Sequence, residues 1–237
     1  MNWRGLLDEN AVADLLPVDN AHFAKPLCDG LAVFLEGLPA RRQAEIFTQQ
    51  ANLGAAASMS ERLGLLARSS PVLQKIGQIL ARDRRLAPEL REQLRQLESW
   101  PPTISVEQIQ ANLVQELGPL GRRGVTLEPP ALAEASVAVV IPFRQQDAAG
   151  GWQEGVFKLL KPGIEEVLES ELSLLEDVGV HFSERCDELG IPRLDYQQVF
   201  QQVREKLLEE VALDDEQQNL LAAREVFAED DRVHIPA

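Results

Sequence analysis

The sequence predicts an α+β fold that is predominantly helical. Apolar residues recur at helical spacing through most of the chain, and two β-like segments, 133–141 and 152–160, interrupt that pattern. Hydrophobic residues make up 45% of the 237 residues, which is enough to build a real core. This length allows either one large domain or two small ones.

The charge of the chain is acidic and unevenly distributed. The formal net charge at pH 7 is −15. Residues 161–237 hold 20 Asp and Glu against 7 Lys and Arg, so this part alone carries −13. Such a surface repels nucleic acid, and a DNA- or RNA-binding function is therefore not expected. Most of these carboxylates are expected to form solvated helix faces.

The cysteine and apolar patterns predict neither a metal site nor a membrane span. Cys28 and Cys186 lie far apart, without a CxxC motif or a Cys/His cluster, so no structural zinc site is expected and a reducing compartment fits. No stretch approaches 18 consecutive apolar residues, and the first residues lack the long apolar core of a signal peptide. The three histidines are scattered and form no catalytic pattern with a serine or cysteine.

The first part of the chain is predicted to be helical. Residues 1–36 are expected to form short helices, and residues 39–68 are rich in Ala, Gln, Leu and Arg, which favour helix. Ser70 and Pro71 mark the start of the next helix, with Ser70 as the N-cap and Pro71 at the first helical position.

The helix that begins at Pro71 carries a polar face. Lys75 and Gln78 stand three residues apart and share this face, with Gly77 between them. Glycine inside a helix costs about 1 kcal/mol relative to alanine, so Gly77 indicates a close approach of another chain segment. Two interpretations of the polar face remain open: ordinary solvent contact, or a wall of a functional cleft.

Two more helices are expected before the β region. Pro88 opens the first, which ends before Trp100-Pro101-Pro102. Ser105 with Gln108 resembles a capping box and predicts a second helix to about residue 117. A glycine-containing loop over 118–124 follows.

The β region is predicted to contain two strands joined by a polar loop. Residues 133–141 read as a small-residue turn that leads into a β-branched run, and residues 152–160 form the second strand. Helical spacing resumes at Ile164 and continues to about Leu189, and again over 196–227. Residues 233–236 resemble a final short strand.

Lys158 interrupts the apolar run of the second predicted strand. A lysine within a buried strand is costly unless its ammonium group finds an anionic partner. A lysine at a strand edge that extends its charge to solvent is the alternative.

Four stretches, in this order, resemble motifs of the UbiB family of atypical protein-kinase-like proteins, which is named for ubiquinone biosynthesis. Each stretch alone is a weak signal, but the order and context together are strong. The resemblance covers residues 71–236. The stretches are Lys75-Ile76-Gly77-Gln78 for the KxGQ motif, residues 133–138 for the alanine-rich loop that replaces the kinase glycine-rich loop, Gly155–Lys158 with Lys161–Ile164 for the lysine strand, and Glu210–Asn219 with Phe227 and residues 233–236 for the last segment.

The sequence departs from the family pattern at several positions. Position 212, where an ExD motif would place Asp, is alanine, and Val139 stands where the family usually has Gln. Glu134 adds an anion to the alanine-rich loop, which is unfavourable beside phosphate. The family's catalytic loop and metal-binding Asp belong to a C-terminal lobe beyond Ala237. The chain is therefore expected to be either a fragment of a longer protein or an N-lobe-like remnant.

The resemblance implies a fold and a division into domains. Residues 125–237 would form a kinase-like N-lobe, which is a small antiparallel sheet with a long C-type helix. Residues 1–124 would form an α-helical N-terminal extension that includes the KxGQ-like helix.

The resemblance also implies a nucleotide site. Lys158 would hold the phosphates and Glu216 would hold Lys158, as the two catalytic residues. Glu210 and Glu216 lie six residues apart, about 120° around an ideal helix, so Glu210 is expected to pair with Lys75 instead. Solvated carboxylates are the alternative for both. The remaining nucleotide-binding residues would be Ala133, Ala135, Ser136 and Val137, and the regulatory residues that cover the cleft would be Lys75, Gly77, Gln78 and Glu210.

The expected function is the nucleotide-binding N-terminal half of a UbiB-like atypical kinase or ATPase. It would use ATP or ADP with Mg, whose ligands would come from the missing C-lobe, and would support ubiquinone or isoprenoid-lipid metabolism. The isolated chain is expected to be inactive. Its expected location is the cytoplasm or the periphery of the inner membrane, with a lipid-pathway protein as a partner.

Two alternatives to this function remain. Ala212, Glu134 and the absent C-lobe favour a non-catalytic pseudokinase or protein-interaction module. A helical adaptor at a lipid surface is the weaker one, because the net charge opposes binding to anionic lipid.

Overall fold

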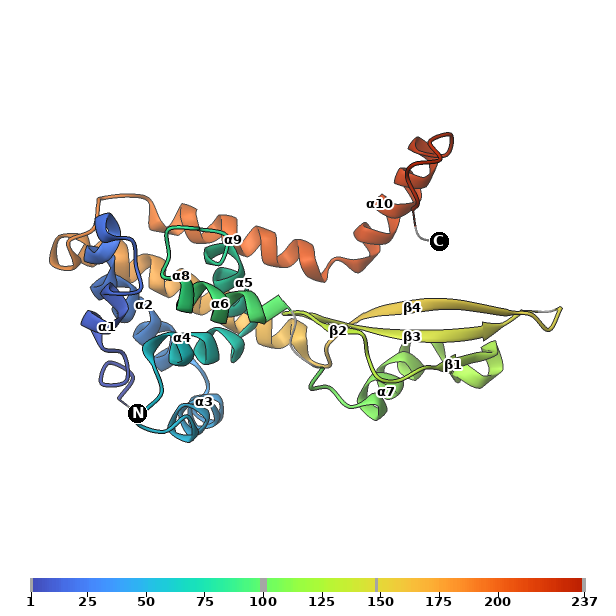
Figure 1. The fold of residues 1–237 in the computed structure, drawn as a ribbon, viewed down its shortest axis with the longest axis horizontal. Helices are drawn as coiled ribbons and strands as arrows, with labels where there is room; N and C mark the ends of the chain where they lie inside the picture. Colours follow the sequence, from blue (N-terminus) through green and yellow to red (C-terminus); the bar gives the residue numbers. More distant parts are fainter. Residues whose placement is uncertain (1, 99–101, 148, 236–237) are drawn as a thin grey trace.

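The computed structural model of the protein describes residues 2–98, 102–147 and 149–235. Within these residues the fold is α+β and predominantly helical, as predicted (Figure 1). The helices are α1 (Glu9–Ala13), α2 (Ala24–Gly37), α3 (Ala40–Asn52), α4 (Met59–Arg68), α5 (Pro71–Leu80), α6 (Pro88–Arg95), α7 (Val106–Leu117), α8 (Ile164–Leu189), α9 (Tyr196–Val211) and α10 (Leu213–Val226), with 3-10 turns η1 (Val18–Phe23), η2 (Gln96–Glu98) and η3 (Leu120–Arg123). The strands are β1 (Val125–Leu127), β2 (Ala133–Glu134), β3 (Ala138–Gln146) and β4 (Trp152–Leu160).

Side-chain caps set the starts of two predicted helices. The Ser70 hydroxyl accepts a hydrogen bond from the Leu73 amide at 3.0 Å, and Pro71 occupies the first helical position of α5. Ser105 and Gln108 form a full capping box at the start of α7. Both starts are confirmed, because each cap satisfies amide groups that the first helical turn leaves without partners.

Two of the predicted helical regions are each divided in the structure. Residues 39–68 form α3 and α4, because Gly54 adopts a left-handed φ of 77° after α3 and Ser58 caps the start of α4. Residues 196–227 form α9 and α10, because Ala212 leaves the helical region with φ −80° and ψ 66°.

The strand predictions need two corrections. The three-residue strand β1 was not expected from the sequence. The predicted strand over 233–236 is wrong for residues 233–235, which are irregular and pair with no strand. Pro236 lies outside the described residues, as do Trp100 and Pro101, which were expected to end a helix.

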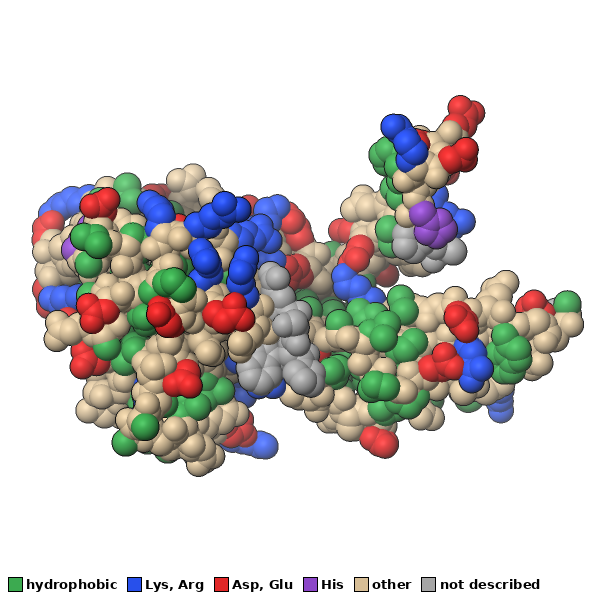
Figure 2. Space-filling view, viewed as in Figure 1, with side chains coloured by type: hydrophobic (Ala, Val, Ile, Leu, Met, Phe, Trp, Pro, Cys, Tyr) green, Lys and Arg blue, Asp and Glu red, His purple; other side chains and the backbone are tan. Residues whose placement is uncertain are grey.

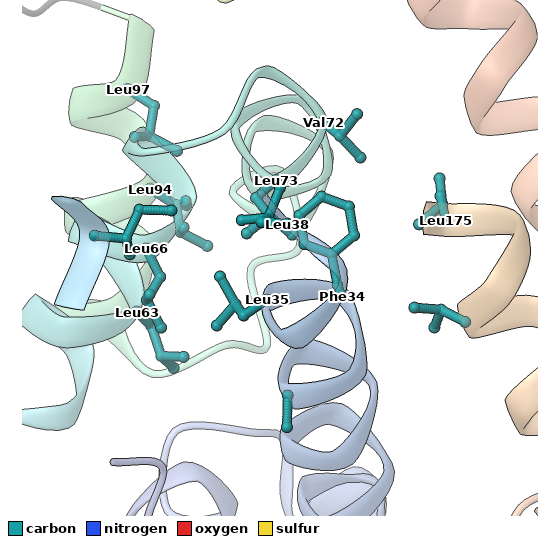
Figure 3. Packing of buried hydrophobic residues seen from close by; sticks show 14 of the residues in the cluster. Phe34, Leu35, Leu38, Leu63, Leu66, Val72, Leu73, Leu94, Leu97 and Leu175 are labelled. Atoms are coloured by element: carbon teal, nitrogen blue, oxygen red, sulfur yellow. The ribbon is translucent and has the colours of Figure 1, made fainter. Parts of the chain in front are cut away.

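The N-terminal helices and two later ones share one hydrophobic core. Leu35 of α2, Leu66 of α4 and Leu73 of α5 are buried in it, as Figure 3 shows from close by. Leu172 of α8 and Leu207 of α9 belong to the same core. Segments from both sides of the predicted domain boundary at residue 124 therefore pack together, and the two-domain division stays a prediction.

The sheet projects from this helical body (Figure 1). Strand β3 lies in the middle and pairs antiparallel with β4 on one edge and with β1 and β2 on the other. Val139, Ile141 and Leu159 point to one face and pack with Ile109 and other apolar residues of the α7 region. The opposite face carries Lys158 and has no such cover, and Figure 2 shows exposed hydrophobic side chains over the sheet.

One buried carboxyl group joins α8 to the start of α5. Glu171 is 2% exposed, and its Oε2 accepts a hydrogen bond from the Ser70 hydroxyl at 2.7 Å. Within the described part of the chain, its Oε1 has no hydrogen-bond partner. Burial raises the pKa of Glu171 from its ordinary value of 4.5 to about 6, although the hydrogen bonds from Ser70 and Val72 oppose this.

This raised pKa predicts a pH-dependent stability that a glutamine removes. Because the folded state holds the Glu171 proton more tightly, its stabilising effect is complete below pH 4.5 and is lost as the pH rises through about 6. From pH 4 to pH 7, the free energy of unfolding should fall about 2 kcal/mol further in the wild type than in Glu171→Gln. Urea unfolding at both pH values measures this, and equal pH slopes for the two proteins would contradict the prediction.

Candidate functional site

A cleft of about 620 Å³ lies where α5, the turn after β2, β4, α9 and α10 meet. It is the place where most of the site residues predicted from the sequence come together. The predicted residues that line it are Lys75, Gln78, Ala135, Ser136, Val137, Lys158, Glu210 and Glu216.

The Lys75–Glu210 ion pair joins α5 to α9 at one side of this cleft. The two side chains are 21% and 30% exposed, so water screens the pair only in part. The other oxygen of Glu210 accepts a hydrogen bond from the Ser136 hydroxyl at 3.1 Å. One carboxylate therefore connects the helical extension, α9 and the alanine-rich loop.

Lys158 forms an ion pair with Glu216 of α10 at the other side. In the sheet register Lys158 stands opposite Val140, on the face that α7 does not cover, and this alternation directs its ammonium group toward α10. The side chains of Lys158 and Glu216 are 42% and 49% exposed. The expectation that Lys158 lies within a fully buried strand is therefore wrong, because only one face of β4 is covered.

The two glutamates serve two different lysines, but the geometry differs from the one assumed for a single helix. Ala212 ends α9 and begins α10, so Glu210 and Glu216 stand on separate helices with a bend between them. Their separation comes from this bend as well as from their spacing in the sequence.

Acidic side chains outnumber lysines around the cleft. Lys75, Lys158 and Lys206 contribute three positive charges, against four negative charges from Glu209, Glu210, Asp215 and Glu216. The lining thus carries −1 in total, and both lysines that were expected to hold phosphate or α5 are already paired. A phosphate group would have to compete with these carboxylates for Lys158.

Glu134 lies outside this cleft and is matched by positive partners. It forms an ion pair with Lys161 at 2.8 Å and accepts hydrogen bonds from the Thr103 hydroxyl and the Ile104 amide. Burial alone would raise the pKa of Glu134, but Lys161 and Thr103 together lower it below 4.5. Glu134 is therefore a neutralised anion, and the expectation that it repels phosphate in the site is wrong.

Two other predicted site residues also lie outside the cleft lining. Ala133 belongs to β2 and pairs with Val140. Gly77 faces the helical body, where an added Cβ would lie 2.9 Å from Leu97 Cδ1 and 3.1 Å from Leu94 Cδ2. Gly77 therefore permits close packing between α5 and η2, and not a contact with the cleft.

The cleft also includes residues that the sequence reasoning did not select. Lys206 and Glu209 come from α9, and Asp215 and Asn219 from α10. Helical spacing from Glu210 and Glu216 is the signal that could have found them. In the part of the chain that the structure describes, no group of three or more His, Cys, Asp or Glu side chains is placed to hold a metal ion.

Comparisons with known proteins agree with this arrangement of motifs. Residues 96–237 match the family model described as the ABC1 atypical kinase-like domain. A probable protein kinase UbiB from Marinobacter nauticus is 36% identical over 121 residues, or 50% of this chain and 21% of the relative. A probable protein kinase UbiB from Xanthomonas campestris pv. campestris is 30% identical over 217 residues, or 87% and 38%.

A plant protein gives a third comparison. An uncharacterised aarF domain-containing protein kinase from Arabidopsis thaliana, described as chloroplastic, is 31% identical over 148 residues, or 62% of this chain and 26% of the relative. No solved structure matches the chain. The chain spans between 21% and 38% of the length of these three relatives. Because the family model matches more than half of the chain, the protein belongs to the ABC1 atypical kinase-like domain family.

Proposed function

We propose that the cleft binds an adenine nucleotide and that the chain is the nucleotide-binding part of a UbiB-like atypical kinase or ATPase. The observation that carries this proposal is the convergence of Lys75, Lys158 and the 135–137 backbone on one cleft from three separate segments. Its volume of about 620 Å³ is within the range of pockets for small molecules.

Each residue has a distinct role in this proposal. Lys158 contacts phosphate oxygens, and Glu216 keeps its ammonium group near the cleft in the absence of nucleotide. Backbone groups of Ala135, Ser136 and Val137 border the phosphates. Glu210 fixes both Lys75 and Ser136, which positions the loop.

A magnesium ion bound with the nucleotide would neutralise phosphate charge. The carboxylates of the described residues form no metal-holding group, so no ligand is assigned to this ion and no step depends on it. The negative total charge of the lining implies that this chain alone binds nucleotide weakly.

The biological role rests on the relatives. Similarity to proteins named UbiB supports a function in ubiquinone or isoprenoid-lipid metabolism, with a lipid-pathway protein as partner. We place the protein in the cytoplasm or at the periphery of the inner membrane. No helix among the described residues is long and apolar enough to cross a bilayer.

One observation favours a second candidate function, a non-catalytic pseudokinase or interaction module. Ala212 lines the cleft at the bend between α9 and α10, where a family carboxylate would stand. With that carboxylate absent and both lysines paired with glutamates, the cleft could serve only to hold the helices in place.

Titration with ATP should separate the two functions. We expect Mg-ATP to shift the amide NMR signals of residues 135–138 with a Kd weaker than about 0.1 mM, and Lys158→Ala to weaken binding at least about tenfold. A phosphate-release assay should detect no turnover. Lys25→Ala is the matched control, because Lys25 contacts the Glu188 carbonyl far from the cleft and should leave the Kd unchanged.

Three results would count against the proposed nucleotide site. Magnesium-dependent turnover that is lost in Lys158→Ala would show that the site is complete without further residues. Tight binding that is unchanged in this variant would place the nucleotide elsewhere. Absence of any shift would favour the interaction module.

A second test concerns α5 as a cover of the cleft. Gln78 forms part of the cleft wall, and Gln78→Ala shortens this wall without changing its charge. We expect fluorescent N-methylanthraniloyl-ATP to associate several-fold faster with this variant in stopped-flow measurements. Gln96→Ala, in η2 and outside the cleft lining, is the control. Equal association rates for wild type and Gln78→Ala would contradict a covering role.

A further inference from the structure

A second and larger cavity lies on the other side of the alanine-rich loop. Its volume is about 790 Å³, against about 620 Å³ for the nucleotide cleft. Ala135 and Ser136 line both, so this short segment separates the two spaces. The other walls come from α3, α4, the start of α5, residues 103–104 and the turn from β4 to α8.

The charge of this second cavity is opposite to that of the protein. Arg42, Arg68 and Lys161 line it with three positive charges, and Glu134 supplies the one negative charge. Its lining therefore carries +2 in a chain of net charge −15. Lys161 already neutralises Glu134, so Arg42 and Arg68 provide the excess.

Neighbouring contacts hold Arg42 in position at this cavity. Its guanidinium group donates to the Ser69 carbonyl and pairs with Glu45 at 3.3 Å. Two carboxylates lie behind the lining: Glu45, and the buried Glu171 beneath Ser70. Both are hydrogen-bonded, and the cations of the lining are the charges that face the cavity.

The rest of the lining is largely apolar. Side chains from four helical segments and from the turns beside the loop contribute to it. They are Leu65, Pro71, Leu97, Ile104, Ile164 and Val167. A cavity with apolar walls and a few charged groups suits a ligand that has an apolar body and an oppositely charged head group.

We propose that this cavity binds a small amphiphilic anion, with an apolar body against the leucine and isoleucine side chains and a phosphate or carboxylate group near Arg42 and Lys161. This site is separate from the nucleotide cleft. The net positive lining attracts an anion to this part of an otherwise acidic surface.

NMR titration with octyl phosphate tests this site directly. Amide signals of Ser69, Thr103 and Ile104 should shift, and Arg42→Gln should raise the Kd about tenfold. Arg41→Gln is the matched control, because Arg41 also pairs with Glu45 but is 91% exposed and does not line the cavity. Arg42→Lys, which keeps the charge, should retain affinity within a few-fold.

Further ligands and variants separate the possible origins of the signal. Inorganic phosphate and octanol should each bind at least about tenfold more weakly than octyl phosphate, because each lacks one half of the ligand. Leu65→Trp should block binding by filling the cavity. Lys158→Ala should leave the Kd for octyl phosphate unchanged, which keeps this result independent of the nucleotide proposal.

Several outcomes would overturn the proposal. They are equal affinity for inorganic phosphate and octyl phosphate, equal Kd values for wild type and Arg42→Gln, or signal shifts confined to residues outside the cavity. Circular dichroism of each variant checks that it folds, and Leu65→Trp tests the cavity without removing any hydrogen bond of Arg42.

Discussion

The cleft depends on the carboxylate of Glu210, which contacts both Lys75 and Ser136. These three residues lie far apart in the sequence and belong to α5, the alanine-rich loop and α9. A partly exposed ion pair of this kind contributes only about 1 kcal/mol or less to stability. Its importance is positional, because it determines how α5 and the loop face each other across the cleft. Both cavities that border the loop take their shape from this contact.

The second constraint is the alternation of side chains along β4. Helix α7 covers one face of the sheet, and Leu159 points into that packing. Its neighbour Lys158 must therefore point to the opposite face, where Glu216 of α10 meets it. Residues on the covered face are structural, and residues on the open face are available for ligands. Val139, where the UbiB-like pattern usually has Gln, is fully buried against α7 and takes no part in the cleft.

Local signals in the sequence predicted much of this fold. Ser70 and Ser105 predicted helix starts, because a cap involves only a few neighbouring residues. The length of β4 followed from its apolar run. The bend at Ala212 and the orientation of Glu134 could not be predicted, because both depend on distant contacts. Lys161 and Thr103 turn Glu134 away from the cleft, and they lie about 30 residues from it in the sequence on either side. The ion pairs of the two lysines were expected only through the family motifs, whereas the second cavity leaves no local pattern at all.

A double-mutant cycle on Lys75 and Glu210 tests the central claim most directly. The free energies of unfolding of the wild type, Lys75→Met, Glu210→Gln and the double variant give the coupling between the two side chains. The structure predicts a favourable coupling of about 0.5–1 kcal/mol, which is at the upper end for an ion pair that is still partly exposed. The more exposed Lys206–Glu209 pair should give a smaller value in the same measurement. A coupling of zero for Lys75 and Glu210 would show that their contact does not hold α5 to the cleft, and would contradict the account.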